Sequence, residues 1–187
     1  DLVYEENPAL SQTDVFNLAA DYLGADEYHL VVDPLADYIE HIDCWGKFLD
    51  VDKMLVASVP ATDSRYADFE AMADYWANQT SSYGNKFQVY RTAWMVDDNA
   101  YTNSLIMNNK VLIPFNPGPA GDYNADAAAV YEEAMPGYEI IGITYSSFIY
   151  RWRSTDALHC RTHEVPDFEM LRILHYPILD TVEYQNS

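Results

Sequence analysis

The chain has 187 residues, 49% of them apolar and 21% charged, which is typical of one globular domain and excludes intrinsic disorder. It carries 30 acidic and 10 basic side chains, and this net charge of −20 makes nucleic acid and anionic membranes poor partners. No apolar run approaches the ~20 residues that cross a bilayer, and 2 cysteines are too few for a disulfide scaffold.

The first predicted helix covers residues 11–23. Ser11 or Thr13 is a suitable N-cap, because a hydroxyl oxygen can accept a hydrogen bond from a free backbone amide of the first turn. Gly24 is a natural C-terminal stop. After a short turn, an apolar run over residues 28–32 predicts a strand.

The same order of helix and strand recurs farther along the chain. Residues 66–79 carry apolar side chains at helical spacing, and strand-like runs over residues 54–59 and 87–91 flank them. Two further short strands are predicted over residues 104–107 and 111–115.

Between those short strands, Asn108 and Asn109 are suited to a tight hairpin turn. The last helix is predicted over residues 124–135, with Asn124 as its cap, and an apolar run over residues 138–143 predicts a strand after it.

Polar residues recur at nearly equivalent places in this pattern. The predicted helices begin on the order of 55 to 58 residues apart, which indicates a repeated strand–helix–strand unit. His41 and Asp43 lie in one unit, Asn103 in the next and Cys160 in the third. If the units surround a pseudo-symmetry axis, these side chains converge on one site.

The segment DALHCRTHEVPD contains Cys160, for which several roles are open. It could form a disulfide with Cys44, or it could bind zinc beside His159 and His163, although no second Cys/His cluster complements such a site. It could also be an inert buried thiol or a nucleophile.

The His41-x-Asp43 pair favours the nucleophile. A cysteine nucleophile needs a partner that helps to form the thiolate and shuttles protons, and histidine is the usual one. A neighbouring carboxylate can orient that histidine or bind a cationic group of the substrate. From the residues alone, the nucleophile is favoured about as much as the disulfide, the metal ligand and the inert thiol together.

Four segments resemble a known family: YIEHIDCWGKFLDVDKMLVASVP, YTNSLIMNNKVLIPFN, AMPGYEIIGI and TDALHCRTHEVPD. They are similar to the bacterial, Porphyromonas-type peptidylarginine deiminases, which belong with agmatine deiminases in the guanidine-modifying superfamily. The resemblance runs over nearly the whole chain. It implies an α/β pentein fold (an α/β propeller) of five strand–helix modules, with this chain covering the C-terminal modules only.

The resemblance also implies an activity. Members of the family hydrolyse the guanidinium of peptidylarginine, with a C-terminal arginine preferred here, to citrulline and ammonia through a covalent thiouronium. By residue match, Cys160 is the nucleophile, His41 the general acid and base, and Asp43 the guanidinium ligand, and Asn103 completes the catalytic group. No metal and no organic cofactor is expected.

Two further residues match family positions that line the substrate pocket, Tyr38 and Ile39. Because the family's catalytic domain is longer, residues 1–187 are expected to be its C-terminal part, with the N-terminal modules lying outside them. Those modules carry a second guanidinium-binding aspartate and the basic residues that recognise the substrate's C-terminal carboxylate.

The expected partners are a peptide or small guanidine substrate and the N-terminal part of the same enzyme, as a separate chain or segment. A homo-oligomer is the other way to cover the apolar strand edges and helix faces of an incomplete domain. Alternative functions are deimination of agmatine or another small guanidine, and a non-catalytic fragment that binds arginine-rich partners. The sequon at Asn78 points to a secreted protein.

Overall fold

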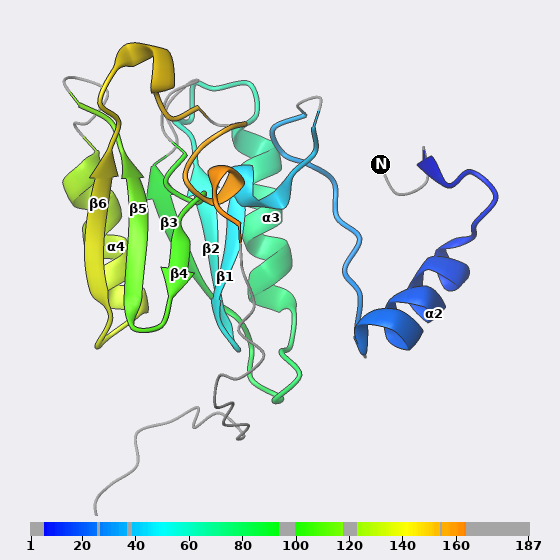
Figure 1. Cartoon of the computed structure of the whole chain (residues 1–187). Coiled ribbons are helices and arrows are strands. Elements are labelled where there is room, and N and C mark those ends of the chain that lie inside the picture. Colours follow the sequence, from blue (N-terminus) through cyan, green and yellow to red (C-terminus); the bar gives the residue numbers. More distant parts are fainter. Residues whose placement is uncertain are drawn as a thin grey trace, which may run out of the picture.

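The computed structural model describes residues 6–25, 27–36, 39–93, 100–117, 123–153 and 155–163. Within these ranges the protein is a mixed α/β structure with two three-stranded sheets, and two of the described helices pack against them (Figure 1). None of the helices in the described part is both long and apolar enough to cross a membrane.

The first unit has the order strand, strand, helix, strand. Its elements are β1 (Gly46–Asp50), β2 (Lys53–Ser58), α3 (Tyr66–Asn78) and β3 (Gln88–Ala93). β1 pairs antiparallel with β2, and β2 pairs parallel with β3, so α3 is the crossover that two parallel strands require. β1 was not predicted.

The second unit repeats this order. Its elements are β4 (Leu105–Met107), β5 (Lys110–Phe115), α4 (Asn124–Ala134) and β6 (Glu139–Thr144). β4 pairs antiparallel with β5, and β5 pairs parallel with β6. The hairpin turns at Asn108, whose φ of 54° is a left-handed value that asparagine tolerates. The predicted repeat is therefore confirmed for these two units.

One predicted cap is wrong. Tyr123, not Asn124, is the N-cap of α4, and its side chain makes no capping hydrogen bond. The Asn124 side chain instead accepts a hydrogen bond from the Tyr101 hydroxyl at 2.9 Å and donates to the Asn116 carbonyl at 2.8 Å. Asn124 therefore ties α4 to the segments on either side of the second hairpin.

The chain begins its described part with a helix that stands apart from the sheets, α2 (Gln12–Leu23) (Figure 1). Ser11 caps it in a reciprocal pair of hydrogen bonds with Asp14, and Gly24 ends it at a φ of 65°, as predicted. Residues 28–32 follow as an extended segment and not as the predicted strand. An apolar run becomes a strand only with a hydrogen-bonded neighbour, and the described part supplies none there.

Two hydrophobic cores lie on opposite faces of the first sheet. Met54 and Val56 of β2 face α3, where they pack with Phe69 and Trp76. Leu55 points the other way and packs in a second core with residues of the hairpin and α4. Because successive side chains of a strand alternate between faces, β2 joins the two units through a continuous packed interior.

Candidate active site

The site is organised around Asn103, which is fully buried in the turn before β4. Its Nδ2 donates to Asp43 Oδ2 at 2.8 Å and to Cys160 Sγ at 3.2 Å. Its Oδ1 accepts from the backbone N–H of His159 at 2.8 Å and of Cys160 at 3.3 Å. One buried amide thus satisfies its polar atoms by joining three distant segments.

Each of these segments brings one chemical group. Asp43 lies in the 3-10 turn η1 (Ile42–Cys44), and Cys160 lies in the 3-10 turn η4 (His159–Arg161). Figure 1 shows both turns beside the loop that precedes β4. Thr102 Oγ1 donates to the Asp43 carbonyl at 3.0 Å, so the turn around Asn103 holds η1 through backbone and side chain alike.

The structure brings all four predicted catalytic residues together. One polar atom each of His41, Asp43 and Cys160 lies within 4.8 Å of the others, and Cys160 Sγ is 3.6 Å from Asp43 Oδ2. Cys44 and Cys160 are free thiols, the first buried and the second exposed, so the disulfide and the inert buried thiol are wrong for Cys160. An exposed thiol beside a histidine can act as a nucleophile.

His159 contributes a contact that the sequence did not reveal. Its Nδ1 lies 2.7 Å from Asp43 Oδ2, with the side chains of His159 and Asp43 48% and 20% exposed. Asp43 Oδ2 therefore meets Asn103, His159 and the thiol of Cys160. These donors and the partial burial hold one oxygen of the carboxylate in place while His159 still reaches solvent.

Arg161 fixes the loop that carries the thiol. Its Nε and Nη2 donate to the two carboxylate oxygens of Asp156 at 2.9 and 2.7 Å, and other N–H groups reach the carbonyls of Tyr150 and Arg151. The guanidinium lies 4.9 Å from the centre of the Trp152 ring. The hydrogen bonds from Arg161 lower the pKa of Asp156, which keeps this clamp charged.

The cluster of Cys160, His41 and Asp43 also has donor types that metal ions use. The Asn103 amide N–H groups point at both the Asp43 carboxylate and the Cys160 sulfur, however. An N–H donor aimed at those two atoms suits a negatively charged pair better than a cation that binds both. The zinc set considered from sequence, with His159 and His163, is not the set that gathers here.

The two predicted pocket residues have different outcomes. Ile39 is half-buried and packs against the first core, and its place in a substrate pocket stays a prediction. Tyr38 lies outside the described residues.

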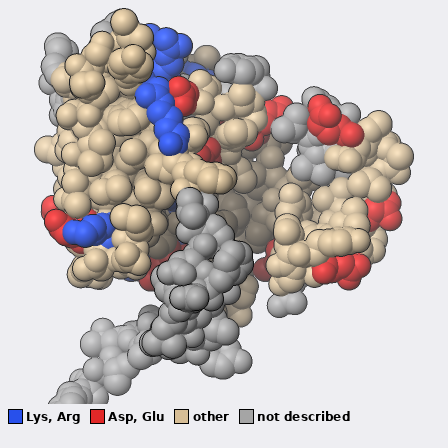
Figure 2. Space-filling model, viewed as in Figure 1, with Lys and Arg blue, Asp and Glu red and all other residues tan. Residues whose placement is uncertain are grey.

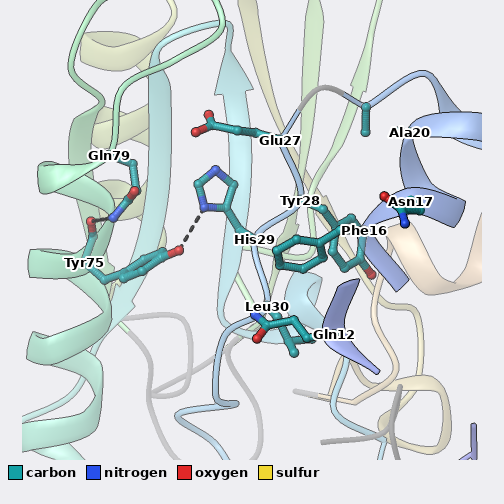
Figure 3. A pocket seen from close by; sticks show the side chains of 11 residues that line it. Gln12, Phe16, Asn17, Ala20, Glu27, Tyr28, His29, Leu30, Tyr75 and Gln79 are labelled. Carbon is teal, nitrogen blue, oxygen red and sulfur yellow. Dashed lines mark hydrogen bonds between the residues drawn. The ribbon is translucent and has the colours of Figure 1, made fainter. Parts of the chain in front are cut away.

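A separate cavity of about 490 Å³ lies between α2 and α3 (Figure 3). His29 points across it and its Nδ1 lies 2.8 Å from the Tyr75 hydroxyl, while the rings of Phe16 and Tyr28 meet edge to face. Burial, helped by the charge of Glu27, raises the pKa of Tyr75. No cysteine lines this cavity, so it is distinct from the Asn103 cluster.

Residues 2–166 match the family model of the Porphyromonas-type peptidyl-arginine deiminases. The chain belongs to this family. The predicted family is thereby confirmed, and the Asn103 cluster lies where three of the four quoted family segments meet in space.

Known relatives of the chain agree with the family. A protein of Shewanella baltica OS155 that is named an agmatine deiminase is 23% identical over 190 residues, 86% of this chain and 49% of the relative. A Porphyromonas gingivalis structure named an arginine deiminase has a TM-score of 0.64 at 24% identity, over 82% of this chain and 47% of that one. The structure of the agmatine deiminase of Enterococcus faecalis has a TM-score of 0.64 at 16% identity, over 74% of this chain and 45% of that one.

These structural likenesses show that the chain has the fold of the deiminases. The chain spans about half the length of the relatives that it matches.

Proposed function

We propose that this chain carries the nucleophile-bearing part of a guanidine deiminase active site, and that the complete enzyme converts peptidyl arginine, preferably C-terminal arginine, to citrulline and ammonia. The observation that carries the proposal is the Asn103 amide, which holds Asp43 and the thiol of Cys160 together. His41 lies within reach of both.

In the first step, Asp43 binds the guanidinium by charge-assisted hydrogen bonds and fixes its carbon for attack. The Cys160 thiolate adds to this carbon, and a new C–S bond forms. His41 gives its proton to one guanidinium nitrogen, the C–N bond breaks, and ammonia leaves. The product of this step is a thiouronium on Cys160.

In the second step, the same imidazole removes a proton from water, which attacks the thiouronium carbon. The C–S bond breaks, the thiolate leaves, the remaining hydroxyl proton passes to solvent, where it converts the released ammonia to ammonium, and the ureido group of citrulline is released. His41 ends the cycle protonated and Cys160 ends it as the thiolate, so both groups are ready for another substrate. Asn103 supports the sulfur through its amide N–H in both steps.

A small guanidine such as agmatine is the second candidate substrate. The Shewanella baltica and Enterococcus faecalis relatives are named agmatine deiminases, which favours a small guanidine. The family model favours peptidyl arginine. The third candidate function is binding of arginine-rich partners, which the net charge of −20 supports. One acidic surface for such a partner is α2, which has no basic residue and shows acidic side chains in Figure 2.

We further propose that the complete site needs modules outside these residues, arranged with the present units as a pentein. The first unit and the second each have a hairpin, a helix and a parallel strand. α2 and the extended residues 28–32 resemble the last two parts of such a unit. The N-terminal part of the enzyme, as a chain or segment, would supply the missing hairpin.

One assay separates these functions. Citrulline, or carbamoylputrescine from agmatine, is measured with a C-terminal-arginine peptide, free arginine and agmatine, on this chain alone and after complementation with the N-terminal half of a family member. Cys160→Ala is expected to abolish turnover, because the other cysteine of the chain, Cys44, is fully buried and its thiol is not accessible to the substrate.

Turnover of agmatine alone would assign the small-guanidine class. Turnover that survives Cys160→Ala would contradict the proposed nucleophile. A folded, complemented protein that hydrolyses none of the three guanidines would leave the binding function as the better account.

A further inference from the structure

β1 directs a lysine to the face of the first sheet that shares a core with Tyr101, two residues before Asn103. Phe48 packs edge to face on Trp76 of α3, with ring centres 5.1 Å apart, so its neighbours in the strand lie on the opposite face of the sheet. Leu49 confirms this direction, because it is buried in the second core. Lys47 is half-buried on the same face as Leu49, a few residues after the turn that holds Asp43.

The charges that act on Lys47 belong to the proposed site. Burial lowers the pKa of Lys47, and the negative charges of Asp43 and Cys160 partly oppose this effect. In the described part of the chain, the Lys47 ammonium makes no ion pair or hydrogen bond. Other lysines differ, since Lys53 donates to the Ala134 carbonyl and Lys86 donates to the Asn78 carbonyl.

Other groups near Cys160 that can carry a positive charge are engaged with a carboxylate or are imidazoles. Arg161, on η4, is held by the Asp156 carboxylate. His159, also on η4, contacts Asp43, and His41 begins η1. Within the described residues, Lys47 is therefore a cation on this face of the first sheet whose ammonium is not paired with a carboxylate.

We propose that Lys47 is a positioning residue that acts through the field of its ammonium, keeping Asp43 and the Cys160 thiolate charged together. Two neighbouring anions repel each other, and a partly buried cation nearby offsets that repulsion more than an exposed one. The importance of Lys47 for turnover rests on the proposed function, whereas its effect on the thiol does not.

The test measures the alkylation rate of Cys160 by iodoacetamide as a function of pH, read by intact mass, in Lys47→Met and Lys47→Arg. Lys47→Met is expected to raise the pH midpoint by about half a unit to one unit, which slows alkylation about three- to tenfold below the midpoint. Lys47→Arg is expected to restore the rate, because it keeps the charge. Cys160→Ser gives the background rate of alkylation at Cys44, the other free thiol.

Lys86→Met is the matched control, since it removes the same charge from an exposed position. Thermal unfolding checks that each variant is folded; Lys47→Met is expected not to unfold earlier, because burying an ammonium opposes folding. An unchanged midpoint in folded Lys47→Met, or an equal shift in Lys86→Met, would overturn the proposal. Alkylation needs no turnover, so this result is independent of the proposed deimination.

Discussion

At the scale of single residues, one buried asparagine does most of the assembly. Asn103 accepts from two backbone amides of η4 and donates to Asp43 and Cys160. These contacts link residues that lie 57 and 60 positions apart in the sequence. The amide therefore both shapes the turn that bears the thiol and orients the carboxylate beside it.

Replacing Asn103 by Ala should affect stability and chemistry together. The partly buried backbone amides of His159 and Cys160 lose their acceptor, which costs up to about 1–3 kcal/mol of folding free energy. Loss of the donor to the sulfur and the carboxylate should lower kcat of the complemented enzyme roughly a hundredfold, by analogy with removal of one preorganised donor. Chemical denaturation and steady-state kinetics measure the two effects.

Asn78→Ala is the control, because Asn78 is exposed at the end of α3. A stable Asn103→Ala variant with full kcat would contradict the role of the amide.

The chemistry-bearing residues could be predicted because they are marked by type and spacing. His41, Asp43, Asn103 and Cys160 were chosen from the repeat and the family segments, and they meet in the fold. The contacts of His159 and Arg161 could not be predicted. They depend on where side chains point after folding, which no pattern along the chain encodes.

At the scale of elements, local periodicity predicted all three described α-helices and most strands. β1 was missed, because GKFLD has little strand signal of its own and is defined by pairing with β2. The run over residues 28–32 was over-predicted for the converse reason. Its residues favour a strand, but the described part of the chain contains no partner for them.

The clamp on the Cys160 turn should weaken in acid. Hydrogen bonds from Arg161 lower the pKa of Asp156 below 3.8, so the clamp contributes fully above pH 3.8 and is lost as pH falls through the lowered value. Asp156→Asn should increase hydrogen–deuterium exchange of residues 157–161 at pH 7. The stability difference between wild type and Asp156→Asn should shrink below pH 3.8.

A difference that stays constant down to pH 2 would show that the carboxylate charge of Asp156 does not hold the turn. Asp14→Asn is the control variant. Hydrogen bonds with Ser11, the N-cap of α2, also lower the pKa of Asp14. Because α2 is far along the chain from η4, this variant removes a carboxylate of lowered pKa without changing the Cys160 turn.

At the scale of the whole molecule, the two strand–strand–helix–strand units share a core (Figure 1). A third part, formed by α2 and the extended residues 28–32, stands beside them. Exposed apolar side chains on this third part include Tyr22, Leu23 and Val32. Such a surface is typical of one that packs against other protein. It fits the proposal that further modules complete the site, in line with the longer relatives.

The central claim is that Asp43 presents a guanidinium-like group to the Cys160 thiolate. The most direct test compares labelling by 2-chloroacetamidine, a planar cation that resembles a guanidinium, with labelling by neutral 2-chloroacetamide, mapped by peptide mass spectrometry. The cation should label Cys160 faster than the neutral reagent does, and Asp43→Asn should remove this preference. Equal labelling by both reagents in the complemented wild-type protein would contradict the account.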